Sequence, residues 1–199
     1  MKNYSQNNEQ EIILNYFGDF KGHFLDIGAY NGVDISNTRA LLELGWTGVL
    51  VEPNPFNLVE LIKNCQEFGD RATIYCAGAG SVSITNRLRL DDTPGRGWAA
   101  SFSEDNPGVL NPSLSRVYVP ILSVWHFLIH GAPHLISIDA EWLDEIILEA
   151  FVPKELEQTR MIIIEPTGGL KGRAQVKKTL AERGFNTLAE TPENIIAAR

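Results

Sequence analysis

The chain has 199 residues, of which 44% are hydrophobic and 21% are charged, and its formal net charge is −8. This composition predicts one globular domain, residues 1–199, that is large enough to bury a full core. The negative charge argues against a large non-specific nucleic-acid surface, because phosphate binding needs a basic face. No apolar run is long enough for a membrane span and the first residues are polar, so we expect neither a span nor a signal peptide. Cys65 and Cys76 lack metal or redox spacing, which favours reduced thiols in a cytoplasmic protein.

The first half of the chain alternates between helix and strand patterns. An N-terminal helical segment is expected over 1–20, with the helix itself at 5–17. The next predicted elements are a strand at 24–27, a helix from Asp34 or Ser36 to Leu44, a strand at 48–51, a helix that starts at Asn54 and Pro55, and strands at 72–77 and 82–90.

Residues 91–116 have a different composition, rich in Gly, Pro, Ser and Asp. Loops of this length are usually functional or disordered. Trp98 and Phe102 within the segment suggest a substrate or lid loop inserted in the domain. The alternative is that the two rings only pin the loop to the body of the protein.

Regular patterns return after this segment. They predict a strand at 117–122, a short helix at 123–129, a strand at 135–138, a helix at 142–151, a strand at 161–164, a helix through Val176 and Leu180, and strands at 185–188 and 195–198. Because strands and helices alternate almost throughout, we expect a doubly wound α/β sheet. The last two strands have no helix between them, which predicts an antiparallel hairpin at one edge.

Acidic residues end four of the predicted strands. They are Asp26, Glu52, Asp139 with Glu141, and Glu165. In open α/β sheets, ligands bind outside the carboxyl ends of the strands, so these side chains should meet at one rim. Buried carboxylates need hydrogen-bond donors, and a ribose, an ammonium group or a metal ion would supply them.

The turn after the first strand, GAYNG, contains Gly28 and Gly32. It lacks the glycine spacing of a pyrophosphate loop, since Tyr30 stands where a middle glycine would let phosphate approach. A glycine turn without phosphate-binding features suits S-adenosylmethionine (SAM), which contains adenosine but no phosphate. Glu52 follows Gly28 at the spacing of an acid that binds ribose. The small Ala77 and its neighbour Gly78 would leave room for adenine.

Several segments together resemble the FkbM family of SAM-dependent methyltransferases. They are SQNNEQE, FLDIGAYNG, SNT at 36–38, GWTGVLVEPNP at 45–55 and SIDAEWLDEIILEAF at 137–151. The resemblance implies a class I methyltransferase (Rossmann-like) fold, with a seven-stranded sheet and an antiparallel last strand. It also implies O-methylation of a hydroxyl on a sugar, polysaccharide or polyketide-like product.

The resemblance assigns roles to individual residues. The cofactor-binding set it implies is Asp26, Gly28, Ala29, Gly32, Asn37, Thr38, Glu52 and Asp139, to which the sequence adds Ala77. Asp139 and Glu141 form the acidic pair near the sulfonium, and either is a candidate base for the acceptor proton. The family usually has glycine after this pair, where this chain has Trp142, which puts the acceptor in doubt more than the cofactor.

Other interpretations stay open at this point. One is a SAM- or glycan-binding module without catalysis, and another is an NAD-type Rossmann oxidoreductase, which the missing glycine and the short chain disfavour. No metal is expected, although a divalent ion at Asp139, Glu141 or Glu165 is an alternative that activity in EDTA would exclude. His126 and His130 could share a helix face, but a break before His134 should keep the three apart. We expect a small-molecule or glycan acceptor and no nucleic acid, and the sequence does not reveal the oligomeric state.

Overall fold

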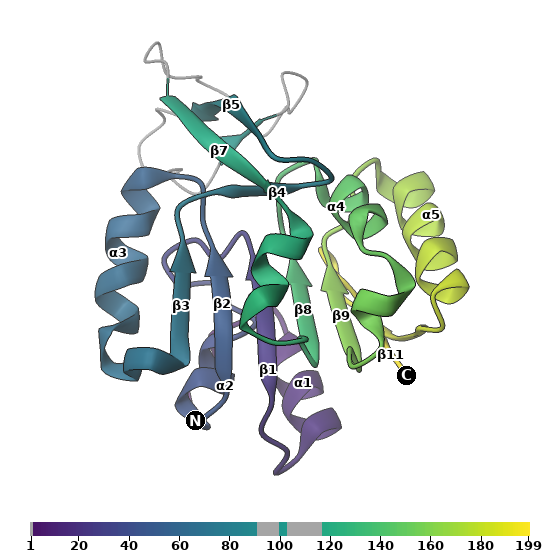
Figure 1. Cartoon of the computed structure of the whole chain (residues 1–199). Coiled ribbons are helices and arrows are strands. Elements are labelled where there is room, and N and C mark those ends of the chain that lie inside the picture. The colour runs from purple at the N-terminus through teal and green to yellow at the C-terminus, as the bar shows by residue number, and fades with distance from the viewer. Residues whose placement is uncertain (1, 91–99, 103–116) are drawn as a thin grey trace.

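The computed structural model of the chain describes residues 2–90, 100–102 and 117–199. Its centre is a seven-stranded sheet in the order β10-β11-β9-β8-β1-β2-β3 (Figure 1). These strands are β1 (His23–Ile27), β2 (Thr47–Val51), β3 (Ala72–Tyr75), β8 (Leu135–Ile138), β9 (Met161–Ile164), β10 (Asn186–Glu190) and β11 (Ile195–Ala198). Neighbours pair in parallel except at β11, which is antiparallel to both β9 and β10. The predicted doubly wound sheet with its antiparallel last strand is thus confirmed.

Helices cover both faces of this sheet (Figure 1). One face packs on η2 (Val124–His130), α4 (Asp144–Ala150), η3 (Pro153–Leu156) and α5 (Gly169–Glu182). The other packs on α1 (Glu9–Phe17), α2 (Arg39–Glu43), α3 (Pro55–Cys65) and η1 (Gln66–Arg71). Leu25 and Ile27 enter the first core, whereas Phe24 enters the second. Because both faces are buried, the central strands are continuous apolar runs rather than alternating ones.

A second, four-stranded sheet lies beyond the carboxyl ends of the central strands (Figure 1). Its order is β4-β7-β5-β6. Its strands are β4 (Gly78–Gly80), β5 (Ile84–Leu90), β6 (Ala100–Ser101) and β7 (Val117–Ser123). The strand predicted at 72–77 therefore ends early, at Tyr75, and the chain crosses to the small sheet. Glycine suits the crossing, since an added Cβ on Gly80 would lie 2.9 Å from Ile121 Cγ2.

Two N-terminal helices start later than predicted. α1 begins at Glu9 because the Ser5 hydroxyl accepts a hydrogen bond from Gln10 N (3.1 Å) and holds the preceding residues in a turn. α2 begins at Arg39, whose backbone N–H donates to Ser36 Oγ (3.1 Å). Such bonds let a side chain replace helical bonds of the backbone. None of the helices among the described residues is long and apolar enough to cross a membrane.

The predicted substrate or lid loop at 91–116 falls mostly outside the described residues. Trp98 lies outside them, whereas Phe102 and strand β6 lie within them. β6 pairs antiparallel with β5, and Ser101 stands opposite Arg89 in this pairing. This pairing places residues 100–102 above the central sheet, where they bear on the site described next.

Candidate active site

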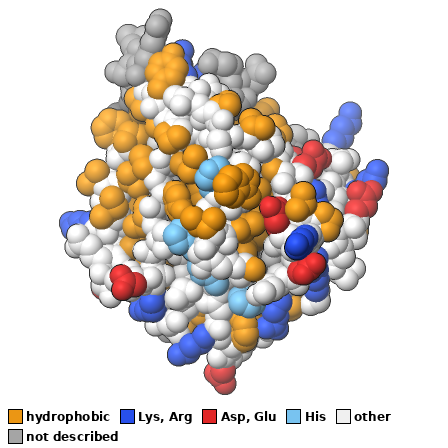
Figure 2. All heavy atoms as spheres, viewed as in Figure 1, with side chains coloured by type: hydrophobic (Ala, Val, Ile, Leu, Met, Phe, Trp, Pro, Cys, Tyr) orange, Lys and Arg blue, Asp and Glu red, His pale blue; other side chains and the backbone are white. Residues whose placement is uncertain are grey.

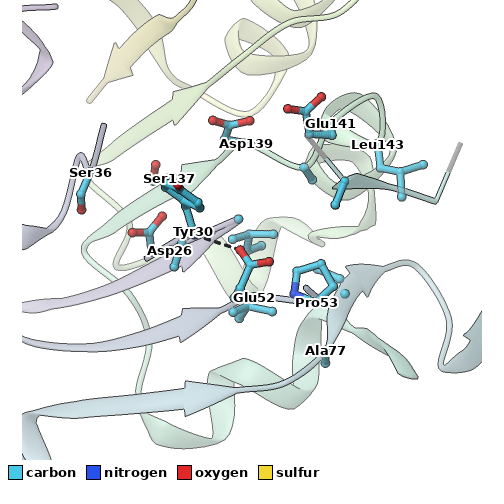
Figure 3. A pocket seen from close by; sticks show the side chains of 18 of the residues that line it. Asp26, Tyr30, Ser36, Glu52, Pro53, Ala77, Ser137, Asp139, Glu141 and Leu143 are labelled. Carbon is cyan, nitrogen blue, oxygen red and sulfur yellow. Dashed lines mark hydrogen bonds between the residues drawn. The ribbon is translucent and has the colours of Figure 1, made fainter. Parts of the chain in front are cut away.

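A cavity opens at the carboxyl ends of β1, β2 and β8 (Figure 3). It holds about 880 Å³ of free space, part of which is open to solvent. Of the residues proposed from the sequence as cofactor-binding or catalytic, those that line it are Asp26, Gly28, Ala29, Asn37, Glu52, Ala77, Asp139 and Glu141. Gly32 and Thr38 lie outside this lining. The fold thus gathers residues from widely separated parts of the chain around one space.

The turn after β1 brings bare backbone to the cavity wall. Gly28 has φ +88°, a conformation that residues with a Cβ rarely adopt. Its N–H donates to Val51 O (2.9 Å), as does that of Ala29 (3.1 Å). An added Cβ on Gly28 would lie 1.7 Å from the carbonyl oxygen of Asp139. The turn therefore needs glycine both for its φ angle and for close packing against the end of β8.

Asp26 is buried at the inner end of the cavity. Its Oδ2 accepts a hydrogen bond from Thr38 Oγ1 at 2.5 Å. Burial raises the pKa of Asp26 to about 6, although hydrogen bonds from Thr38 and Ser137 act in the opposite direction. Ser137 Oγ in turn accepts from the side chain of Asn37 (3.2 Å). Thr38 therefore supports the site by orienting Asp26 rather than by facing the cavity.

Glu52 presents a buried carboxylate at the end of β2, with 5% of its surface exposed. Its two oxygens accept backbone hydrogen bonds from Tyr30 N (2.9 Å) and Asn54 N (2.7 Å), and Figure 3 shows the first of these. Burial nevertheless raises its pKa to about 7. Oε1 also accepts a long hydrogen bond from Asn57 Nδ2 (3.5 Å). Each carboxylate oxygen can accept two hydrogen bonds, so Oε2 in particular can still accept one from a ligand.

Small residues form the opposite wall beyond β3. Ala77, Gly78 and Ala79 line the cavity, together with Phe102 from the segment after β6. The Phe102 ring lies against Gly78, where an added Cβ would be 2.5 Å from ring atom Cε2. This wall of the cavity is therefore apolar. Gly32, by contrast, packs the β1 turn on α3, because an added Cβ would lie 2.6 Å from Leu61 Cδ1.

The turn after β8 carries the two acids proposed from the sequence as catalytic. Asp139 continues the pairing with β1, since its N–H donates to Ile27 O (2.9 Å). The helix predicted at 142–151 begins only at Asp144, whose carboxylate accepts from Ala140 N (2.7 Å) and Trp142 N (3.2 Å). These bonds hold the residues between as a turn, and Figure 3 shows Asp139 and Glu141 along one side of the cavity.

Carboxylates crowd this end of the cavity. Burial raises the pKa of Asp139 well above its ordinary value, and the negative charge of Glu165 raises it further. Burial also raises the pKa of Glu165 to about 7, with a contribution from Glu141. Asp144, buried behind the turn, has its pKa raised by burial to about 8. At neutral pH this group of acids therefore retains protons that isolated carboxyl groups would lose.

These raised pKa values predict that the folded state loses stability as the pH rises. Asp26, Glu52, Glu165 and Asp144 ionise at ordinary, lower pH in the unfolded chain, so the folded chain binds more protons between about pH 4 and pH 8. For Glu52 alone the loss approaches roughly 3 kcal/mol. Denaturant titrations across this range should show the free energy of unfolding falling towards pH 8, with a shallower fall in Glu52→Gln. A stability that increases from pH 5 to pH 8 would contradict the assignment.

Several lining residues were not identified in the sequence as site residues. Examples are Tyr30, Ser36, Pro53, Ser137 and Leu143. Ser137 carried a usable signal, because it precedes Asp139 by two positions on one strand and so shares its face. Tyr30, Ser36 and Pro53 are direct sequence neighbours of the identified residues Ala29, Asn37 and Glu52, and this adjacency was a further usable signal.

The three histidines make separate contacts. His130 Nε2 lies 2.8 Å from the Tyr75 hydroxyl, His126 Nδ1 lies 3.2 Å from Ser123 O, and His134 Nδ1 accepts from His23 N (3.1 Å). Figure 2 shows histidine side chains spread along one face rather than gathered at a point. Within the residues that the structure describes, no group of His, Cys, Asp and Glu is suited to hold a metal ion.

The strand order of the central sheet, with β11 antiparallel between β9 and β10, defines a class I methyltransferase fold. The sequence model of the FkbM methyltransferase domain matches residues 26–187. This chain therefore belongs to the FkbM methyltransferase family, as the sequence motifs indicated.

Solved structures agree with this fold. The FkbM methyltransferase from Methylobacillus flagellatus aligns with 90% of this chain and 44% of its own length, at 15% identity and a TM-score of 0.60. A precorrin-6y C5,15-methyltransferase from Geobacter metallireducens aligns with 100% of this chain and 91% of its own, at 16% identity and a TM-score of 0.53. The chain thus spans less than half of the FkbM structure. Comparison with curated proteins finds no match.

Proposed function

We propose that the chain is a SAM-dependent O-methyltransferase that acts on a hydroxyl of a sugar, polysaccharide or polyketide-like small molecule. The observation that carries this proposal is the arrangement of three carboxylates in one cavity. Glu52 lies beside the glycine turn, and Asp139 and Glu141 lie along the other side (Figure 3). Membership of a methyltransferase family supports methyl transfer as the reaction.

The cavity fits SAM in two respects. Gly28 lets the β1 turn pack closely on the end of β8 and lines the cavity, so the backbone of this turn forms a wall that suits the methionine or ribose part. The Glu52 carboxylate can accept both ribose hydroxyls, while Ala77 and Phe102 provide an apolar wall for adenine. When bound, SAM supplies an electrophilic methyl group on a sulfonium. The crowded carboxylates at Asp139 would face that positive charge.

The residues of the chain then position the acceptor and take its proton. Methyl transfer is an in-line displacement, so holding the acceptor hydroxyl in line is the main requirement. Asp139 or Glu141, which both line the cavity, would remove the hydroxyl proton as the new bond forms. The raised pKa of Asp139 would make it a stronger base once it is ionised.

We expect a small or glycan acceptor rather than a nucleic acid. A protein from Pyrococcus horikoshii described as an RNA methyltransferase shares the fold, at 15% identity and a TM-score of 0.54. The net charge of this chain is −8, however, and phosphate backbones bind to basic surfaces. Fold similarity at this level of identity carries no information on the acceptor.

Calorimetry with SAM, S-adenosylhomocysteine and NAD tests the cofactor. The proposal requires saturable binding of the first two and none of NAD. Transfer of tritium from methyl-labelled SAM to candidate acceptors then separates a methyltransferase from a binding module. Binding of NAD in preference to SAM would overturn the proposal.

Amide substitutions test the proposed base. We expect that Asp139→Asn or Glu141→Gln lowers kcat by about 10²–10⁴-fold, whichever of the two residues takes the proton. In the variant that lacks the true base, affinity for S-adenosylhomocysteine should change much less than kcat. Glu149→Gln, at an exposed position on α4, is the matched control. If both amides left turnover intact with the cofactor bound, neither residue would be the base.

A further inference from the structure

A second cavity adjoins the first and shares Asp139 and Glu141 with it. It holds about 510 Å³ of free space, part of it open to solvent. Its far side is built by the link between β9 and α5, from Glu165 to Gly168, and its near side includes Trp142. The two carboxylates therefore stand between a space that fits the cofactor and a space that none of the roles assigned above uses.

Trp142 stands in this wall in an unusual backbone conformation. Its φ is +81° and that of Glu141 is +50°, so two successive residues adopt angles that favour glycine. A bulky residue at such an angle is strained, and strain of this kind concentrates at functional sites. The side chain is 39% exposed, so packing in the core does not explain the tryptophan.

Two hydrogen bonds hold this strained turn. Ser101, which is 1% exposed, donates from Oγ to the carbonyl oxygen of Glu141 (2.7 Å), and Trp142 N donates to Asp144 Oδ2 (3.2 Å). The first bond joins the small sheet to the turn. The backbone that carries Trp142 at the cavity wall is thus held from both sides of the turn.

The second cavity is also lined by acidic side chains. Among the described residues that line it, four are acidic and none is Lys or Arg. An anionic group brought into this space would find no Lys or Arg among these residues to pair with, and every acid that ionises would repel it. A hydroxyl or an ammonium group would instead donate hydrogen bonds to them.

We propose that the second cavity is the acceptor subsite and that Trp142 is its specificity-determining wall. This subsite would take a ring-shaped acceptor that is neutral or cationic. The ring would stack on the indole, and its hydroxyls would donate hydrogen bonds to Asp139 and Glu141. This inference rests on the proposed methyl transfer. It adds a preference for a neutral or cationic acceptor, and it gives a role to Trp142, which stands where the family usually has glycine.

Three methyl glycosides of the same ring shape test the charge preference. Methyl glucoside, methyl glucosaminide and methyl glucuronide are titrated into the full chain loaded with S-adenosylhomocysteine, and binding is followed by saturation-transfer NMR. We expect the glucuronide to bind at least about 10-fold more weakly than the other two. Equal or tighter binding of the glucuronide, or no binding of any glycoside, would overturn the inference.

Substitutions test the wall. Trp142→Gly, which suits the observed φ, should weaken glucoside binding by about 3- to 10-fold, and Trp142→Phe should retain most of it. Trp125→Ala, at an exposed tryptophan of η2 outside both cavities, should leave it unchanged. Unchanged glucoside binding in Trp142→Gly would overturn the inference while leaving the proposed function intact. If the wild-type chain did not bind S-adenosylhomocysteine, that result would instead refute the proposed function.

Discussion

Replacing Gly28 with alanine is expected to lower the free energy of unfolding by about 3 kcal/mol or more. Two costs combine at this position. The φ of +88° is unfavourable for alanine, and the new Cβ would lie 1.7 Å from Asp139 O, an atom of the backbone that has no side-chain freedom to move away. The strands β1 and β8 would have to separate at the carboxyl end. Denaturant unfolding of Gly28→Ala measures the effect.

A matched control separates the two costs. Gly184 has φ +81°, but its nearest atom to an added Cβ is Arg199 Nε at 3.8 Å, an ordinary contact. Gly184→Ala should therefore show only the conformational cost, about 1 kcal/mol. Affinity for S-adenosylhomocysteine should fall in Gly28→Ala and not in Gly184→Ala, because only the first distorts the cavity wall. Equal losses of stability in the two variants would show that the close approach to Asp139 is unimportant.

Replacing Glu52 with glutamine should weaken S-adenosylhomocysteine binding by about 100-fold or more. A carboxylate that accepts two ribose hydroxyls makes two charge-assisted hydrogen bonds, each worth about 1.5–3 kcal/mol. The glutamine amide has only one acceptor oxygen, and Tyr30 N and Asn54 N already compete for it. Calorimetry at pH 8, where most of the wild-type carboxylate is ionised, gives the clearest difference.

Stability and affinity should change independently in this variant. Because burial raises the pKa of Glu52 to about 7, ionising it in the apo protein is costly at pH 8, and the neutral amide avoids this cost. Glu52→Gln should therefore bind poorly without a matching loss of stability at pH 8. Glu60→Gln, on the exposed side of α3, is the control and should bind normally. Wild-type affinity in Glu52→Gln would remove Glu52 from the ribose site.

Much of the fold followed from local patterns in the sequence. The alternation of apolar strand segments with helix patterns predicted a doubly wound α/β sheet, because a helix between two strands lets them pair in parallel. The absence of a helix between the last two strands predicted their antiparallel pairing. Acids placed at strand ends also indicated one rim, since parallel strands end on the same side. Glu52 and Asp139 do line one cavity.

Only the tertiary structure decided which of those residues face the cavity and which support it from behind. Thr38 supports Asp26 instead of facing the cavity, and Gly32 packs on α3, although both belong to the motif segments. The bond from Ser101 to Glu141 joins residues 40 positions apart. Local patterns record which residues form strands, helices and turns, because those depend on near neighbours. Contacts such as the bond from Ser101 to Glu141 depend instead on how the two sheets meet.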